Sequence, residues 1–318
     1  MEHILVSNIM KHLEEHDILY QWQHGFRPKR STETQLLTFI HELSQNLDRK
    51  KQTDIAILDF SKAFHKVPHQ RLALKLDHHG VRGTALNWIS SFLANRSQCV
   101  VLEGEASETV EVTSGVHQGS VLGPILFLIY INDLPVGISS GVRLFADDAI
   151  VYRTISTPLD SQTLQEDLNK LSNWEKLWLM EFNAKKCEIL TVTKKASPLV
   201  TDYILHGQVL QNVTSSKYLG VTITRDLRWN THIDNISAKA NKTLGFVKRN
   251  VRTRQTAIKT KAYQALVRPT LEYCTCVWDP HTQVAARKLE SVQRRAARYC
   301  LYIYHNTSSV TNMLNILN

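Results

Sequence analysis

The chain has 318 residues, 43% of them hydrophobic, which is enough to bury a large core in one domain or in two to three smaller ones. Its net charge of +9 favours an anionic partner such as nucleic acid, and five cysteines without a C-x-x-C pair argue against a disulfide framework and a zinc site. No apolar run reaches the roughly 18 residues of a membrane span, so we expect a soluble intracellular protein.

Helices and strands alternate in the first part of the chain. Apolar residues recur at helical spacing from Leu36 to Leu47, and the apolar run of residues 55–58 predicts a buried strand that ends at Asp59. Helices are expected from Pro68 to Gly80 and over residues 84–93. Two strands, residues 98–102 and 109–113, should then be joined by a turn that contains Gly104.

The pattern changes after residue 225. Before it we expect an apolar helix over residues 121–131, an apolar hairpin over residues 142–152, an amphipathic helix over 164–178, and strands within 188–193 and 217–224. Beyond Trp229 the spacing predicts three helical pieces, broken near Arg252 and at Asp279-Pro280. Residues 225–298 hold 16 Lys or Arg against 5 Asp or Glu, so the basic charge is concentrated in this helical region.

Asp147 and Asp148 interrupt the apolar hairpin and need an explanation. An exposed Asp-Asp turn is the simpler interpretation, because Asp is common in turns. Two adjacent carboxylates within apolar flanks are costly, however, unless a cation neutralises them. Asp59 also ends an apolar strand, and if the two strands are neighbours, three carboxylates meet at one sheet edge. Such a cluster suits two magnesium ions that promote phosphoryl transfer.

Three ordered motifs make a resemblance specific. They are residues 57–64 (ILDFSKAF), 114–124 (SGVHQGSVLGP) and 145–148 (FADD). In order and spacing they resemble the central palm motifs of reverse transcriptases of LINE (non-LTR retrotransposon) type. Residues 23–27 (QHGFR) with 30–32 (RST) resemble the fingers motif, and residues 217–221 (KYLGV) resemble the primer grip. Residues 271–273, 277–280, 289–290 and 293–295 are similar to the helical region that follows the palm in these elements.

The resemblance implies an α+β fold with a right-hand polymerase architecture: a palm made of an antiparallel sheet with packed helices, partial fingers, and a basic helical thumb. The implied domains are partial fingers at residues 1–50, palm with the remaining fingers elements at 51–224, and thumb with the C-terminal region at 225–318. The implied activity is RNA-directed DNA polymerisation on an RNA template and a DNA primer, with deoxynucleoside triphosphates and two Mg²⁺ ions. No obligate protein partner and no membrane are implied.

The resemblance also assigns residues to roles. Asp59 and Asp147 would be the principal metal ligands, with Asp148 beside them. The nucleotide site would use Phe64 as the aromatic that excludes a 2′-hydroxyl, Gln118 and Gly119 in the template and nucleotide loop, Arg27 and Arg30 in the fingers, and Lys186, or Lys185 next to it, as the acid that protonates pyrophosphate. A core Phe, a plain turn at Gly119 and solvated arginines are the simpler alternatives.

The basic helices would grip a duplex through its phosphates. The densest cluster holds four cations, Lys248, Arg249, Arg252 and Arg254. A solvated helix face explains any one of them equally well. Taken together, they favour nucleic acid.

Two positions depart from the family pattern. His65 stands where the family has Asp, and His117 stands where it has Pro before Gln118; neither change removes a metal ligand. Only 22 residues precede Gln23, where the family carries an endonuclease domain and further fingers segments, so we expect an N-terminally truncated copy. Two hypotheses follow: an active polymerase, supported by the three acids, and a weak or inactive remnant that only binds nucleic acid.

Overall fold

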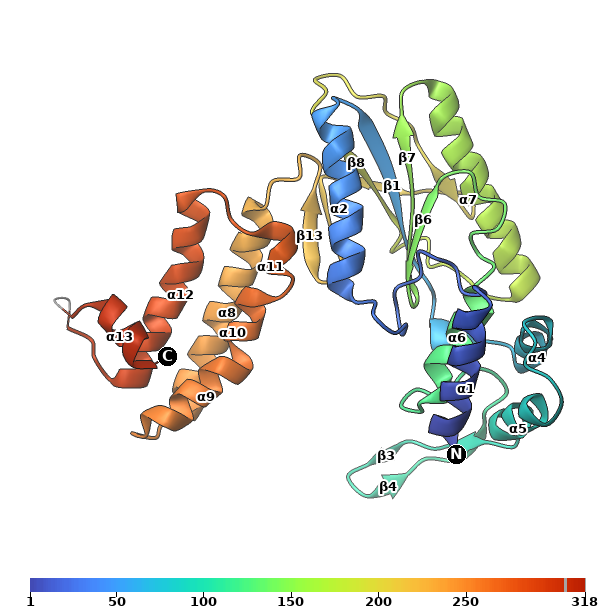
Figure 1. Ribbon diagram of the computed structural model, residues 1–318, viewed down its shortest axis with the longest axis horizontal. Helices are drawn as coiled ribbons and strands as arrows, with labels where there is room; N and C mark the ends of the chain where they lie inside the picture. The colour runs from blue at the N-terminus through green and yellow to red at the C-terminus, as the bar shows by residue number, and fades with distance from the viewer. Residues whose placement is uncertain (306–307, 318) are drawn as a thin grey trace. The chain divides into compact units, whose positions relative to one another are not determined.

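The computed structural model describes residues 1–305 and 308–317, which divide into two compact units, Met1–Thr214 and Ser215–Asn318 (Figure 1). The expected subdivision into fingers, palm and thumb at residues 50 and 224 stays a prediction.

A five-stranded sheet forms the centre of the first unit, in the order β11-β8-β1-β7-β6. The strands are β1 (Gln52–Asp59), β6 (Gly141–Phe145), β7 (Asp148–Ile155), β8 (Glu188–Val192) and β11 (Gln211–Val213). The central strand β1 pairs antiparallel with both β7 and β8, and β6 pairs antiparallel with β7. The antiparallel sheet is thus confirmed for four strands, while β11 adds to β8 in parallel at one edge.

Helices cover both faces of this sheet. Successive side chains of a strand point to opposite sides, so strands buried at consecutive residues need cover on both faces. On one face lies α2 (Thr32–Asp48), which begins with a capping box of Ser31 and Thr34 and places the Phe39 ring 5.1 Å from the Tyr152 ring of β7. The other face belongs to a core that joins Leu58 of β1 to Leu168 of α7 (Pro158–Trp178). The mixed α+β architecture is therefore confirmed.

The apolar helix α6 (Leu122–Ile131) runs through the core that contains Leu58 and Leu168. Nine of its ten residues are buried, and α1 (Glu2–Glu15) and α4 (His69–His78) lie against it. Such burial explains why the sequence is apolar on every side of the helix. Within the described residues, no helix is both long enough and apolar enough to cross a membrane.

Short elements complete the first unit. They are α3 (Ala63–Lys66), α5 (Gly83–Leu93), β2 (Ser97–Gln98), β3 (Val101–Leu102), β4 (Glu105–Ala106), β5 (Val110–Glu111), β9 (Ile204–Leu205) and β10 (Gln208–Val209). The two strands expected around Gly104 form a hairpin with a turn at Glu103-Gly104, but the pairing is interrupted into β3–β4 at the tip and β2–β5 at the base. The side chains of these four strands are exposed, so no core keeps the ladder continuous.

The second unit begins with a hairpin of β12 (Ser215–Tyr218) and β13 (Val221–Thr224). The expected strand region of residues 217–224 is therefore split, because Leu219 and Gly220 both have positive φ, 45° and 87°, and reverse the chain. Gly220 adopts this conformation readily, whereas a side chain at that position would be strained.

Helices make up the rest of the second unit: α8 (Asn230–Asn250), α9 (Thr256–Leu266), α10 (Arg268–Glu272), α11 (Thr275–Trp278), α12 (Gln283–Leu301) and α13 (Val310–Leu317). The predicted breaks near Arg252 and at Asp279-Pro280 are confirmed. Further breaks fall around Pro269, at Cys274, whose φ is 54°, and after Leu301, where Tyr302 has a φ of 61°, so the three expected pieces are six helices in the part of the chain that is described. A core around Leu244 and Val292 joins α8 to α12.

Candidate active site

Asp59, Asp147 and Asp148 meet at one end of the central strand pair. Asp59 lies directly opposite Asp148 in the antiparallel register of β1 and β7. Phe145 pairs with Asp148 across the β6–β7 hairpin, so Asp147 lies in its turn. Opposite residues of an antiparallel pair place their Cβ atoms about 4.5–5.5 Å apart on the same face. The sheet therefore brings together the three carboxylates that sequence analysis singled out.

The two hairpin carboxylates are harder to ionise than a free aspartate. Loss of surrounding water, followed by the charges of Asp147 and Asp59, raises the pKa of Asp148 from 3.8 to about 6. Partial burial also raises the pKa of Asp147, to which the charge of Asp59 adds. Asp147 is half-buried and Asp148 is exposed by surface area, so both remain open to a ligand. Repulsion of this kind is relieved when a cation lies between the carboxylates.

Asp59 is held by the segment that follows α7. Its carbonyl oxygen accepts a hydrogen bond from the Asn183 amide at 2.7 Å, and its own amide donates to Sγ of Cys187 at 3.5 Å. Lys186 from the same segment forms an ion pair with the Asp59 carboxylate, with 3.5 Å between Nζ and Oδ2. No ion pair of Lys185 occurs among the described residues. The geometry therefore favours Lys186 over its neighbour as the lysine of this site.

Phe64 is held by aromatic neighbours. Its ring stacks on Phe127 of α6 at 4.5 Å between centroids and 18° between planes, and it meets the edge of Phe26 at 6.4 Å. The side chain is half-buried, so part of the ring packs on the core while part remains accessible. Both interpretations of Phe64 are compatible with this placement, and the role in sugar selection stays a prediction.

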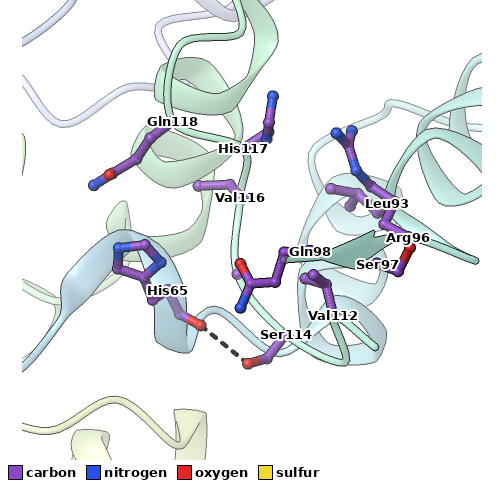
Figure 2. Close-up of a pocket in the computed structure, with 11 residues that line it drawn as sticks. His65, Leu93, Arg96, Ser97, Gln98, Val112, Ser114, Val116, His117 and Gln118 are labelled. Carbon is purple, nitrogen blue, oxygen red and sulfur yellow. Dashed lines mark hydrogen bonds between the residues drawn. The ribbon is translucent and has the colours of Figure 1, made fainter. Parts of the chain in front are cut away.

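Gln118 and Gly119 lie in an exposed loop before α6, and Gly119 has a φ of 92°. Gln118 lines a cavity of about 250 Å³, between this loop, α3 and the base of the β2–β5 hairpin (Figure 2). Its lining residues are His65, Leu93, Arg96, Ser97, Gln98, Val112, Ser114, Gly115, Val116, His117 and Gln118.

The two residues that depart from the family pattern, His65 and His117, line this same cavity. The loop is fastened next to them: the Ser114 hydroxyl donates to the His65 carbonyl at 3.0 Å (Figure 2). Gly115 has a φ of 95°, and a Cβ there would lie 2.8 Å from the same carbonyl oxygen. The cavity lining contains Arg96 but no acidic residue, so its chemistry is that of donors and cations.

The two fingers arginines are engaged within the first unit. Arg27 forms a bidentate ion pair with Glu14 of α1, at 2.9 and 2.7 Å, and its side chain is only 10% exposed. Arg30 is exposed and contacts Nε2 of His24 at 3.2 Å. Burial and the nearby arginines lower the pKa of His24 to about 4, so this imidazole is neutral at pH 7. A nucleotide role for Arg27 requires that the Glu14 pair open.

The basic cluster of the second unit lies at the end of α8 and in the loop after it. Arg249, Arg252 and Arg254 are exposed, and Lys248 is half-buried. Burial and the charge of Arg295 lower the pKa of Lys248. Among the ion pairs of the described residues, none uses these four side chains. Their role in binding phosphate groups stays a prediction.

The segment that resembles a primer grip borders a second cavity, of about 470 Å³, within the second unit. Lys217 of β12 and Lys239 of α8 line it together with His232. The Thr222 amide donates to Nδ1 of His232 at 3.2 Å, while Nε2 is buried without a hydrogen bond in the described residues. Burial and the charge of Lys217 lower the pKa of His232 to about 4.

Comparison with known proteins decides the family. The family described as "Reverse transcriptase (RNA-dependent DNA polymerase)" matches residues 3–223, which hold all three carboxylates. The chain belongs to this reverse transcriptase family. Its similarity to retrotransposon enzymes, expected from the three motifs, is confirmed. The RNA-directed DNA polymerase from the mobile element jockey of Drosophila funebris is 27% identical over 312 residues, and the alignment covers 94% of this chain.

A second relative and one solved structure are also similar to this chain. The probable RNA-directed DNA polymerase from transposon X-element of Drosophila melanogaster is 27% identical over 96% of the chain. This reverse transcriptase chain spans about a third of these relatives' length, 34% and 35%. The structure of apo telomerase from Candida tropicalis aligns with 99% of the chain and 57% of its own, with a TM-score of 0.51 and 10% identity, which supports the polymerase fold.

Reverse transcriptases depend in general on a divalent metal ion. The donor set fits such an ion, because Asp59, Asp147 and Asp148 offer carboxylate oxygens, the ligands that hard cations prefer. Their mutual repulsion would fall when the ion binds. Among the described residues, no three His, Cys, Asp or Glu side chains are already gathered into a closed metal site. The carboxylates are therefore adjacent through the backbone register, and their side chains would close on the ion.

Sequence reasoning missed residues that support the site from a distance. Gln23 was noted only as part of a motif, yet it is buried and contacts the backbone of the Asp147 turn. Phe182, which stacks on Phe60 beside Asp59, follows α7 in a segment without periodic pattern. In the sequence, only the place of Gln23 in the motif of residues 23–27 could have drawn attention to it.

Proposed function

We propose that this chain is the RNA-directed DNA polymerase domain of a retrotransposon, which adds deoxynucleotides to the 3′-hydroxyl of a DNA primer on an RNA template. The activity of the similar retrotransposon enzymes and the match to the reverse transcriptase family support this proposal. One observation carries it furthest. The register of β1 and β7 sets Asp59 opposite Asp148 and next to the Asp147 turn, so three acids converge on an open sheet end.

In the proposed reaction, the primer 3′-oxygen attacks the α-phosphorus of the nucleotide in line with the leaving group. A new O–P bond forms, the bond to the β-phosphate oxygen breaks, and pyrophosphate leaves. The hydroxyl proton passes to solvent or to a nearby carboxylate. Lys186, whose Nζ lies 3.5 Å from the Asp59 carboxylate, would donate a proton to the departing pyrophosphate.

Asp59, Asp147 and Asp148 would hold two Mg²⁺ ions. When bound, these ions lower the pKa of the attacking hydroxyl and stabilise the charge on the leaving oxygens. The chain's own contribution is to set the carboxylates on two paired strands, whose hydrogen bonds leave little freedom to move them apart. Phe64, packed on Phe127, would present a ring edge under the sugar and exclude a 2′-hydroxyl.

A second candidate function is binding of nucleic acid without copying. It is favoured by Arg27, whose guanidinium is occupied by Glu14, and by the two histidines on the Gln118 cavity. In that case the cations Lys248, Arg249, Arg252 and Arg254 would still bind phosphates.

Primer extension separates the two candidates. The protein is incubated with poly(rA)/oligo(dT), dTTP and Mg²⁺, beside Asp147→Ala at equal concentration. We expect extension by the wild type and a loss of at least 100-fold in the variant, because a metal ligand is removed. Equal signals from both proteins would rule out the polymerase. Binding that weakens with salt, without any extension, would support the second candidate.

A further inference from the structure

The turn that presents Asp147 has an unfavourable backbone conformation. Ala146, directly before it, has a φ of 53°, a left-handed value that a residue with a Cβ adopts only when its surroundings hold it there. Ala146 is 6% exposed, so solvent does not relax the turn. Something within the fold must therefore hold Ala146 in place.

Gln23 supplies the contact that does so. Its side chain is 2% exposed, and its Oε1 accepts two hydrogen bonds, from the Ala146 amide at 2.9 Å and from the Gly25 amide at 2.8 Å. Its Nε2 is buried and has no hydrogen bond in the described residues. One amide oxygen thus links the fingers motif to the turn. The Gln23 side chain forms these hydrogen bonds as an acceptor, through Oε1.

The backbone around Gln23 is aligned with the same hairpin. The His24 amide donates to the Leu144 carbonyl at 3.0 Å, and the Leu144 amide donates to the Trp22 carbonyl at 3.1 Å. This short parallel bridge lies beside β6 and pairs with its free edge. At Gly25 a Cβ would lie 2.3 Å from the Ala146 nitrogen, so a glycine is needed for the close approach.

We infer that Gln23 is a positioning residue for the metal-binding carboxylates: it fixes the left-handed Ala146 turn and thereby the direction of Asp147 and Asp148. The inference rests on the proposed polymerase function for its catalytic consequence. Gln23 does not touch substrate; it acts through the backbone. It also gives Gln23 of the fingers motif a defined task in this chain, which is to brace the turn that carries the acids.

The test compares Gln23→Met with Gln52→Met. Methionine keeps the length of the side chain but removes the strong acceptor. Gln52 is also fully buried and exchanges hydrogen bonds with the backbone of Leu199, at 2.8 and 2.9 Å, but it lies at the other end of β1, about 23 Å from Asp59 at the rise of a strand. A loss that is due to a buried glutamine alone should appear in both variants.

Three readouts are measured on the full chain. We expect Gln23→Met to speed hydrogen exchange of the Ala146 amide at least tenfold, to weaken Mn²⁺ binding, and to lower kcat for primer extension, the last two by about 10- to 100-fold. KM for dTTP should change less than kcat. Gln52→Met should leave these three values within twofold of wild type, even where its melting temperature falls by a similar amount.

Two further variants keep the result decisive. Gly25→Ala disturbs the same turn by steric contact and should weaken Mn²⁺ binding in the same way. Gln23→Glu retains an acceptor oxygen, so the Ala146 amide should stay protected from hydrogen exchange, unlike in Gln23→Met. Unchanged exchange and Mn²⁺ binding in Gln23→Met would overturn the inference. If the wild type extends no primer, the proposed function fails, yet exchange and Mn²⁺ binding still decide whether Gln23 positions the turn.

Discussion

Replacing Asp148 with Asn should make the metal-free protein more stable at pH 7.5 while it lowers primer extension. In the folded protein Asp148 lacks part of its water and faces Asp147 and Asp59, which together raise its pKa from 3.8 to about 6. The ionised carboxylate therefore destabilises the fold at neutral pH, and a neutral amide of the same shape does not.

The magnitude follows from the pKa values of the two states. A change from 3.8 to about 6 corresponds to about 3 kcal/mol when nothing screens the charge. Because Asp148 is exposed by surface area, solvent screening reduces this to about 1 kcal/mol. We therefore expect Asp148→Asn to raise the free energy of unfolding by about 1 kcal/mol in EDTA at pH 7.5.

The contribution of Asp148 to the free energy of unfolding changes with pH in the opposite direction to that of an aspartate in a salt bridge. A folded-state pKa above the unfolded value means that the folded protein binds the proton more tightly, so lowering the pH through 6 towards 3.8 stabilises the wild type. The advantage of Asn is therefore full above about pH 6 and disappears below about pH 4. Added Mg²⁺ should also stabilise the wild type more than the variant, because it binds the carboxylates.

Urea unfolding at pH 7.5 and pH 4.5 measures the effect, with hydrogen exchange of β1 and β7 amides to report the unit that holds Asp148. Asp160→Asn is a control of opposite sign. Asp160 accepts hydrogen bonds from the Thr157 and Ser156 amides at the start of α7, which lower its pKa. Replacing it with Asn removes a negative charge from the first turn of a helix, which should cost about 0.5 kcal/mol. A variant at 148 that is no more stable than wild type in EDTA at pH 7.5 would refute the reasoning.

Three more outcomes are expected. Phe64→Ala, which removes the ring stacked on Phe127, should reduce discrimination against ribonucleotides by about 10-fold or more in the ratio of kcat/KM; unchanged selectivity would remove Phe64 from sugar selection. His117→Pro should stabilise the loop by roughly 0.4–1 kcal/mol, since no hydrogen bond of the His117 amide occurs in the described part of the chain, and a lower melting temperature would show that its φ does not suit proline. Lys248→Gln with Arg249→Gln should reduce the slope of log affinity against log salt for a duplex by about 2, and an identical slope would mean that these side chains do not contact phosphates.

Much of the first unit could be predicted from local pattern. Apolar spacing placed α2 and α7, because burial on one face of a helix leaves a period of about 3.6 residues in the sequence. The apolar flanks of Asp147 and Asp148 predicted the β6–β7 hairpin, because a strand buried on both faces reads as a short continuous apolar run. The pairing of β1 with β7 followed from the idea that two strands ending in acid share one edge. That idea was a hypothesis until the register set Asp59 opposite Asp148.

Other features depend on contacts between distant residues. Arg27 read as a free cation, but its partner Glu14 comes from another helix, and no local pattern links them. His65 and His117 are 52 positions apart and share a cavity only because the loop before α6 is fastened to α3. The region of residues 217–224 reads as one strand, yet the positive φ of Leu219 and Gly220 turns it into a hairpin.

The sequence by itself determined the family, the order of the elements and the identity of the three acids, because these depend on residue type and spacing along the chain. Only the tertiary structure decided which strand ends meet, that Lys186 rather than Lys185 pairs with Asp59, and that Gln23 accepts a hydrogen bond from the Ala146 amide. Those facts arise from contacts between residues that are 89 to 127 positions apart, where a hydrogen bond or an ion pair depends on positions that the whole fold sets.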